Sequence, residues 1–202
     1  STHRLRPVLN SMGLPPRRMP QSPSSDADGK IATVITYLEM TQPPTGAAPA
    51  TPPGVDLKQV VHCSVAFYRF LYNTVGQDWL WYERRLTGDP ELAALLADPG
   101  VSIHVAYRQS APAGFFELDS RQIGVVDLAY FGLLPEAIGQ GIGPWLLRQA
   151  LDLAWSLAPA RVTVNTNSLD HPAALPTYRK AGFMPSSAIQ TRIDDPRLLG
   201  IM

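Results

Sequence analysis

Residues 125–143 read VVDLAYFGLLPEAIGQGIG, an apolar run that meets a proline and then crosses a glycine-rich turn into a predicted helix. Glycines at alternate positions, Gly139, Gly141 and Gly143, remove side chains from this junction and leave backbone N–H groups uncovered. The first N–H groups of a helix have no internal partner and lie at the positive end of its dipole. The turn is therefore either a tight helix start with no further role or a site for phosphate or pyrophosphate.

Two common nucleotide-binding motifs do not fit this turn. Counted from Gly139, the Rossmann pattern G-x-G-x-x-G requires glycine at its sixth position, where the sequence has Pro144. The Walker pattern requires Lys and then Ser or Thr after its last glycine, where the sequence has Pro144 and Trp145. A third kind of phosphate-binding loop must therefore be considered.

The composition excludes several classes of function. The 202 residues include 17 Lys and Arg and 17 Asp and Glu, and this zero net charge argues against a nucleic-acid partner held by bulk charge. The single cysteine, Cys63, cannot form an internal disulfide, and it is typical of a reducing compartment, so we expect a cytoplasmic protein. No apolar run reaches about 18 residues and no histidines or cysteines have zinc-motif spacing, so we expect neither a membrane span nor a metal.

The chain divides into a basic, proline-rich N-terminal arm, residues 1–29, and a single domain, residues 30–202. The arm has no acidic residue before Asp26 and little capacity to form a core.

Strand and helix signals alternate through the domain. Strand formers predict a first strand over 31–40, and Asp56 is expected to cap a helix with an apolar face from Val60 to Val75. Further predicted strands are 101–107, 113–119, 123–133, 161–166 and 183–193, and further predicted helices are 92–96, 144–157 and 170–180. The strands between 101 and 133 form an antiparallel meander, and a parallel βαβ crossover follows. The fold class is therefore α+β, with a mixed, mostly antiparallel sheet around a central β-loop-α-β unit.

Two local features each allow two interpretations. The aromatic and charged segment 78–85 is either an amphipathic helix whose tryptophans fill the core or the wall of a substrate site. Gly132, inside a predicted strand, indicates either a β-bulge or a close approach of a ligand to the backbone.

The order of the predicted elements and two sequence motifs resemble those of the GNAT N-acetyltransferase superfamily. The family's pyrophosphate loop (Arg or Gln, two residues, Gly, one residue, Gly or Ala) resembles residues 138–143, with Ile138 at the Arg or Gln position. The family's N-x-x-A-x-x-x-Y-x-x-x-G-F motif resembles residues 171–183, with His171 at the Asn position and Tyr178 at the Tyr position. The resemblance implies a GNAT-like sheet with a central acetyl-CoA-binding unit.

The resemblance also implies where acetyl-CoA (coenzyme A) would bind. The cofactor would lie where the central strand and the next parallel strand splay apart, with its pantetheine paired to backbone and its pyrophosphate on the glycine loop. The implied cofactor-binding residues are Phe131, Gly132, Leu133, Gly139, Gln140, Gly141, Ile142, Gly143, His171, Ala174 and Tyr178. His171 either acts directly or only begins a helix, for which Asp170 is the better cap.

The resemblance implies direct transfer of acetyl from a thioester to an amine, which needs a proton acceptor for the ammonium and a donor for the departing thiolate. Tyr178 occupies the family's usual donor position, unless its ring only packs on the cofactor. For the base we rank Glu117 first, before Asp127, Asp119 and Glu83, and strand alternation predicts Glu117 and Asp119 on one face. The catalytic candidates are therefore Tyr178, Glu117 and Asp127.

The acceptor is the least specified partner. Tyr37, Trp79, Trp81, Glu83 and Tyr130 are the candidate substrate-binding residues, and they favour a small-molecule amine or amino acid. Transfer to a protein N-terminus or lysine is one alternative, and a non-catalytic acyl-CoA-binding or sensor module is another. The assembly we consider is a homodimer.

Overall fold

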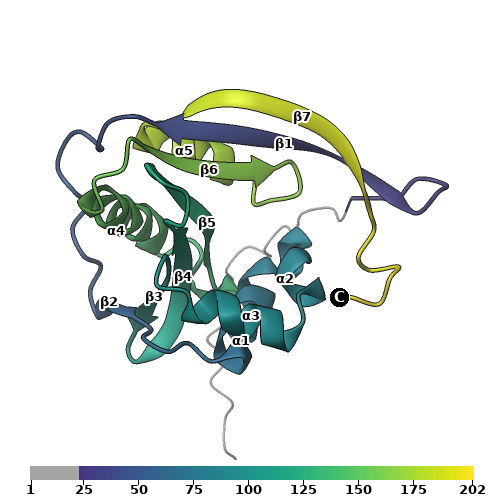
Figure 1. Cartoon of the computed structure of the whole chain (residues 1–202), viewed down its shortest axis with the longest axis horizontal. Helices are drawn as coiled ribbons and strands as arrows, with labels where there is room; N and C mark the ends of the chain where they lie inside the picture. Colours follow the sequence, from purple (N-terminus) through teal and green to yellow (C-terminus); the bar gives the residue numbers. More distant parts are fainter. Residues whose placement is uncertain (1–22) are drawn as a thin grey trace, which may run out of the picture.

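The computed structural model describes residues 23–202 and arranges them around a seven-stranded sheet (Figure 1). The strands are β1 Lys30–Met40, β2 Val55–Gln59, β3 Val101–Arg108, β4 Ala111–Asp119, β5 Val125–Leu133, β6 Arg161–Asn167 and β7 Met184–Asp194. Their order is β2-β3-β4-β5-β6-β1-β7, and every neighbouring pair is antiparallel except β5 with β6. The predicted α+β fold with a mixed, mostly antiparallel sheet is therefore confirmed.

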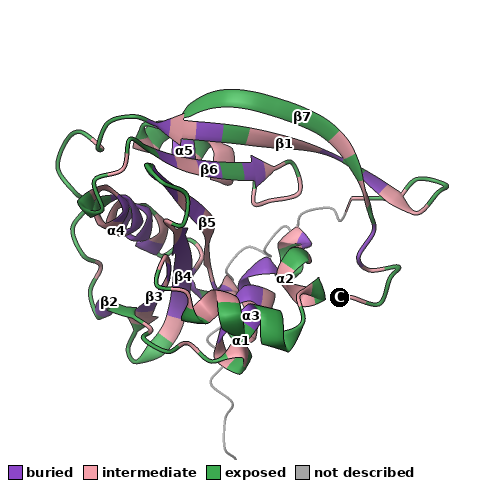
Figure 2. Cartoon of the chain, in the orientation of Figure 1, coloured by how far each residue is buried: buried purple, intermediate pink, exposed green. Residues whose placement is uncertain are grey.

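Helices cover the two faces of the sheet. They are α1 Val65–Gly76, α2 Glu83–Leu86, α3 Asp89–Ala97, α4 Ile142–Ser156 and α5 Ala174–Ala181, with short 3₁₀ helices at Gln77–Trp79 and Pro135–Ala137. Successive strand residues point to opposite faces, so adjacent β4 residues enter different cores. Phe116 joins the core built with α4, whereas Phe115 joins the core built with α1 and α3 (Figure 2).

The predicted helix capped by Asp56 is wrong. Residues Val55–Gln59 instead form β2, in which Asp56 pairs with Tyr107 of β3. The helix begins later, at Val65, and Ser64 caps it because its Oγ accepts the backbone N–H of Phe67 at 3.2 Å. The apolar periodicity was correct within α1, but the capping residue was misassigned.

The segment 78–85 is not one amphipathic helix. A 3₁₀ helix ends at Trp79, Leu80 adopts a left-handed conformation with φ 56°, and the four-residue α2 follows. A Cβ at Gly76 would lie 2.4 Å from the Cβ of Trp81, so only glycine lets this segment fold back over the end of α1. This fold brings the ring of Trp81 beside Tyr130 of the central strand β5 and the ring of Trp79 against His171.

The first strand of the chain is an internal strand of the sheet. β1 pairs with β6 on one side and with β7 on the other, and Leu38 faces Val164 and Pro185. Figure 1 shows β1 and β7 curving together as one two-stranded arm above α2. This arm becomes one wall of the site described below.

Of the predicted N-terminal arm, residues 1–22 lie outside the described residues. A turn at residues 26–29 leads into β1, and Asp26 pairs with Arg192 of β7. In the part of the chain that the structure describes, the helices are all too short or too polar to cross a bilayer.

Candidate active site

The parallel strands β5 and β6 separate along their length. They pair only where they begin, through Val125 with Arg161, Val126 with Val162 and Asp127 with Thr163. Beyond this point β5 continues to Leu133 and β6 to Asn167 without pairing to each other. The facing edges of the two strands therefore open into a wedge in which an extended ligand can hydrogen-bond to backbone.

A β-bulge lies beside the start of this wedge. Leu118 of β4 pairs with Leu128 and Glu117 pairs with Tyr130, which leaves Ala129 as the extra residue. The β-bulge that was considered at Gly132 therefore lies at Ala129 instead. A Cβ at Gly132 would lie 2.4 Å from Cγ1 of Val75, so this glycine admits α1 against β5, although its backbone also lines the cavity.

The glycine loop leaves an open recess at the start of α4. Gly139 and Gly141 have φ of 80° and 77°, values that L side chains rarely adopt, and a Cβ at either would meet nothing within 4 Å. Gly141 is the N-terminal cap of the 15-residue helix, so its first N–H groups lie at this recess. The geometry suits an anion such as pyrophosphate.

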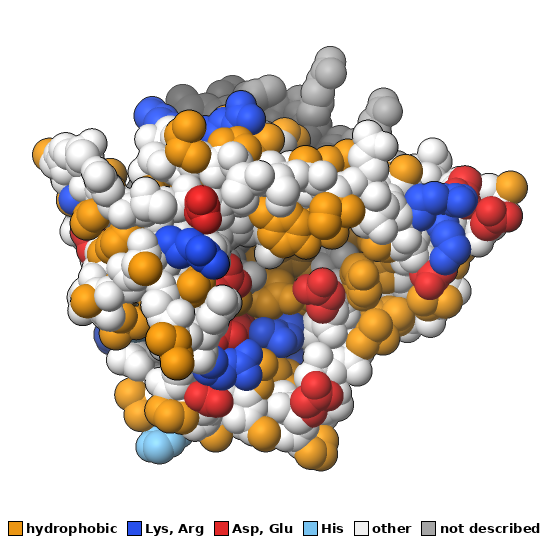
Figure 3. Space-filling model, turned by 45° about the horizontal axis from the view of Figure 1, so that its top comes forward, with side chains coloured by type: hydrophobic (Ala, Val, Ile, Leu, Met, Phe, Trp, Pro, Cys, Tyr) orange, Lys and Arg blue, Asp and Glu red, His pale blue; other side chains and the backbone are white. Residues whose placement is uncertain are grey.

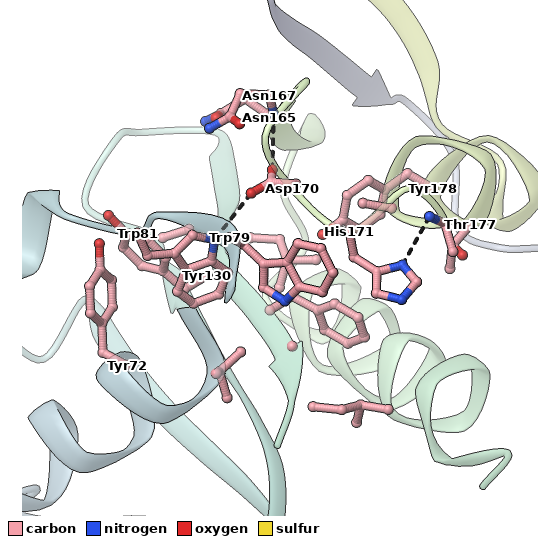
Figure 4. Close-up of a pocket in the computed structure, with 18 of the residues that line it drawn as sticks. Tyr72, Trp79, Trp81, Tyr130, Asn165, Asn167, Asp170, His171, Thr177 and Tyr178 are labelled. Carbon is pink, nitrogen blue, oxygen red and sulfur yellow. Dashed lines mark hydrogen bonds between the residues drawn. The ribbon is translucent and has the colours of Figure 1, made fainter. Parts of the chain in front are cut away.

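One cavity of about 750 Å³ joins the glycine loop, the wedge and the aromatic segment (Figure 4). The predicted residues that line it are Tyr37, Trp79, Trp81, Glu83, Asp127, Tyr130, Phe131, Gly132, Leu133, Gly139, Gly141, Gly143, His171, Ala174 and Tyr178. Three predicted residues do not line it: the side chain of Gln140 donates to the carbonyl of Glu136, Ile142 is fully buried in the core, and Glu117 is covered by other side chains.

Tyr178 is held at the cavity by two aromatic neighbours. Its ring centroid lies 6.3 Å from that of Phe131 and 5.9 Å from that of Phe183, and 6% of the residue is exposed. Burial, together with the charges of Asp170 and Asp127, raises the pKa of Tyr178. The phenol is therefore protonated at neutral pH and can donate a hydrogen bond to a developing anion.

Asp127 lies at the narrow end of the wedge, in the last residue pair before β5 and β6 part. The hydroxyl of Thr163 donates to its Oδ1 at 2.6 Å. Burial raises the pKa of Asp127, and the hydrogen bond from Thr163 opposes this shift. A carboxylate with a raised pKa, facing a cavity, is a better proton acceptor than an exposed one.

Glu117, the first candidate for the base, does not line the cavity, contrary to the sequence prediction. Its side chain is fully buried, Tyr68 donates to one carboxylate oxygen, and Arg84 Nη2 lies 2.8 Å from the other. Burial raises the pKa of Glu117 and the Arg84 charge counteracts it. Because both oxygens are occupied and Arg84, unlike Glu117, lines the cavity, Glu117 anchors Arg84 and does not face the cavity.

Two of the predicted substrate residues, Trp81 and Tyr130, form an aromatic cluster with Tyr72 beside the bulge. Ring centroids of Trp81 and Tyr130 lie 5.2 Å apart, and Tyr72 packs 4.9 Å from Tyr130. The hydroxyl of Tyr130 donates to Glu83 Oε2 at 2.6 Å. The cluster therefore presents an aromatic wall with one carboxylate at its edge.

Asp170 connects the aromatic segment to the strand β6. It accepts hydrogen bonds from Trp81 Nε1 at 3.1 Å and the backbone N–H of Asn167 at 2.9 Å (Figure 4). It also accepts one from Thr166 Oγ1 at 2.7 Å. The expectation that Asp170 caps α5 is wrong, because α5 begins at Ala174 and its N-terminal cap makes no side-chain hydrogen bond.

His171 lies next to this connection. Its Nδ1 accepts the backbone N–H of Ala173 at 3.0 Å, and its ring packs 4.9 Å from that of Trp79. These contacts place His171 on the cavity wall between the aromatic segment and α5, and they are compatible with either of the two roles considered for it.

The cavity-lining residues that were not predicted from the sequence include Ile35, Asn165, Asn167 and Ile193. The asparagines alternate with the buried Val162 and Val164, and this alternation could have shown that they occupy the other face of the strand. The isoleucines carry no local signal, because their placement depends on the pairing of β1 with β7.

The comparison with protein families matches residues 66–183, more than half of the chain, to the Acetyltransferase (GNAT) family. No curated protein matches the chain.

Solved structures of similar fold include a tandem GNAT protein from the clavulanic acid biosynthesis pathway (15% identity, 81% of this chain and 53% of that chain, TM-score 0.58). Another is a GCN5-related N-acetyltransferase from Sphaerobacter thermophilus (17% identity, 83% and 53% covered, TM-score 0.58). A third is an aminoglycoside acetyltransferase from an uncultured soil metagenomic sample, in complex with trehalose (14% identity, 64% and 88% covered, TM-score 0.53). The chain spans about half the length of the first two. Identities this low show a shared fold alone.

Proposed function

The chain belongs to the GNAT acetyltransferase family, and from this premise we propose that it transfers acetyl from acetyl-CoA to the primary amine of a small molecule. One observation carries the proposal. The wedge between β5 and β6 has a helix N-terminus with open glycines at one end and the half-buried carboxylate of Asp127 at the other. An anionic donor and a cationic acceptor can therefore meet within one cavity.

The residues fit the donor. The recess at Gly139 and Gly141 is empty where a Cβ would stand, so a pyrophosphate can approach the backbone N–H groups closely. Ile138 also lines the cavity, so this chain relies on N–H groups and the helix dipole rather than on a basic side chain there. The open edge of β5 near Phe131 can pair with the amides of a pantetheine arm.

Two residues are assigned to proton movement. Acetyl-CoA supplies the activated acetyl group when it is bound. Asp127 removes a proton from the ammonium so that the nitrogen lone pair is available, and the phenol of Tyr178 donates a hydrogen bond to the sulfur as it leaves. In balance, the N–C bond forms as the C–S bond breaks, and the ammonium nitrogen loses two protons: one leaves through Asp127, and the other balances the proton that the sulfur gains as it departs as the free thiol.

The test is the release of free thiol from acetyl-CoA across a panel of small amines, peptide N-termini and lysine peptides. We expect amine-dependent release with small amines. Release only with peptides would favour protein acetylation instead. Thermal stabilisation by acetyl-CoA without turnover on any amine would favour a non-catalytic binding module, and neither response would refute both the donor and the reaction.

A further inference from the structure

The charged side chains that line the cavity are unevenly distributed in sign. Four carboxylates line it, from Glu83, Asp119, Asp127 and Asp170. Among the described residues that line the cavity, Arg84 is the one lysine or arginine. The carboxylates suit an ammonium group, so the question is whether Arg84 is available to a carboxylate on the same acceptor.

The charge of Arg84 is already balanced. Its Nη2 lies 2.8 Å from Oε1 of the fully buried Glu117, and its Nε donates to the hydroxyl of Tyr68 at 3.2 Å. The guanidinium also stacks over the ring of Tyr130, 5.2 Å from its centroid. A ligand carboxylate would have to compete with Glu117 for this guanidinium, and separating a buried ion pair is unfavourable.

Three of the cavity's carboxylates form no ion pair with a lysine or arginine in the described structure. Asp119 is paired with Arg121 at 2.6 Å, which balances its charge. By contrast, Glu83, Asp127 and Asp170 receive hydrogen bonds from neutral groups, namely a tyrosine hydroxyl, a threonine hydroxyl and the donors already described. This end of the cavity therefore attracts a cation and repels an anion.

The remaining walls at this end are largely apolar. The aromatic cluster and Trp79 form one group, and Ile35 and Tyr37 of β1 with Ile193 of β7 form a second. Figure 3 shows hydrophobic side chains lining much of the hollow on this face, with acidic and basic side chains at its edge. Such walls gain free energy by covering an apolar body rather than a hydrated one.

We propose that the acceptor is an alkyl or arylalkyl amine: one ammonium group on an apolar body, with no carboxylate. The proposal rests on the proposed acetyltransferase function and narrows its substrate class, because it excludes free amino acids. It assigns Glu117 a role in specificity: Glu117 positions Arg84 and cancels the charge that would otherwise recruit a carboxylate.

The test measures kcat/KM for acetyl transfer with matched pairs that differ only in the carboxylate: phenethylamine with phenylalanine, tyramine with tyrosine, and tryptamine with tryptophan. Spermidine and an aminoglycoside represent polycations. We expect each amine to exceed its amino acid by at least about 100-fold, since an unpaired charge must otherwise be desolvated beside three carboxylates. Isothermal titration calorimetry measures the binding of acetyl-CoA in parallel.

Two kinds of variant link the preference to these residues. Glu117→Gln keeps an acceptor for Tyr68 but leaves Arg84 positive, so we expect the preference for amine over amino acid to fall at least about tenfold. Ile193→Ser removes part of the apolar wall, so we expect kcat/KM for phenethylamine to fall at least about fivefold. The matched control is Ile189→Ser on the same strand, half-exposed and outside the cavity lining, which should leave that value unchanged.

The outcomes separate the acceptor class from the underlying reaction. Preference for the amino acids or the polycations, with turnover intact, would overturn the acceptor class and leave the acetyltransferase function standing. Equal effects of Ile193→Ser and Ile189→Ser would also overturn it. Tight acetyl-CoA binding with no turnover on any amine would overturn the function first and the acceptor class with it. If Glu117→Gln does not fold, the matched pairs and the isoleucine variants still decide.

Discussion

Adding one methyl group to the glycine loop should separate ligand binding from stability. We consider Gly139→Ala and Gly141→Ala, with Gly46→Ala as the matched control. Gly46 has φ 86°, a Cβ there would meet nothing within 4 Å, and it lies outside the cavity lining. The three variants therefore impose the same kind of backbone strain, but only the first two place a methyl group where we expect the pyrophosphate.

The magnitudes follow from the geometry. An alanine held at positive φ costs about 1 to 2 kcal/mol, so each variant should lose that much stability, a fall in Tm of roughly 2 to 8 °C for a chain of this size. A methyl group that displaces the pyrophosphate from one backbone N–H removes a charged hydrogen bond of about 1.5 to 3 kcal/mol. This corresponds to a Kd for acetyl-CoA weakened about 10- to 150-fold in the loop variants.

Urea unfolding measures the stability, and isothermal titration calorimetry measures the Kd. We expect all three variants to lose the same stability, and only Gly139→Ala and Gly141→Ala to bind acetyl-CoA more weakly. If Gly141→Ala bound acetyl-CoA as tightly as the parent chain, the loop would not be the pyrophosphate site. If Gly46→Ala weakened binding equally, the effect would be one of global stability.

Further predictions concern four single residues. Asp127→Asn should lower kcat about 10²- to 10⁴-fold. It should also remove the acid limb of the plot of kcat/KM against pH, which in the parent lies above the ordinary aspartate range because burial raises the pKa of Asp127. An unchanged pH profile would argue against Asp127 as the base. The same raised pKa means that this carboxyl's contribution to stability is complete below its unfolded pKa and is lost as pH rises through its folded pKa, which urea unfolding from pH 4 to 8 can follow. Tyr178→Phe should lower kcat about tenfold or more with little change in the KM for acetyl-CoA, and full turnover would leave Tyr178 only a packing role. Gly132→Ala should destabilise the fold by about 1 to 3 kcal/mol in urea unfolding, because the new methyl would lie 2.4 Å from Val75 Cγ1. An unchanged urea midpoint would show that α1 can shift freely. Asp170→Asn keeps one carbonyl oxygen for three donors, so we expect a free energy of unfolding about 1 to 3 kcal/mol lower. We also expect the KM for the amine to rise more than the Kd for acetyl-CoA. Equal rises in the KM and the Kd would indicate a general loss of structure.

Features encoded close together in the sequence were predictable. The glycine loop, the strand before it and the helix after it depend on neighbouring residues, and the sequence prediction placed them nearly where the structure has them. The helix at 65–76 was recognised from its apolar spacing, but its start was not. Asp56 and Ser64 are both good caps, and only the pairing of Val55–Gln59 with β3 decides between them.

Features that depend on distant partners were not predictable. Glu117 looked like a strand-end carboxylate, yet its burial depends on Tyr68 and Arg84, which come from separate helices. Likewise, nothing near Ile193 indicates that β7 pairs with β1 and brings this side chain to the cavity. The donor side of the site is thus encoded by residues close together in the sequence, whereas the acceptor side is assembled from segments far apart in the chain.

The most direct test of the central claim is mass spectrometry of a small amine after incubation with the protein and acetyl-CoA that carries a ¹³C-labelled acetyl group. The structure predicts that phenethylamine gains the labelled acetyl on its nitrogen with the parent chain, and at least about 100-fold more slowly with Asp127→Asn. Unmodified amine across the whole panel, or equal labelling by the two proteins, would contradict the account.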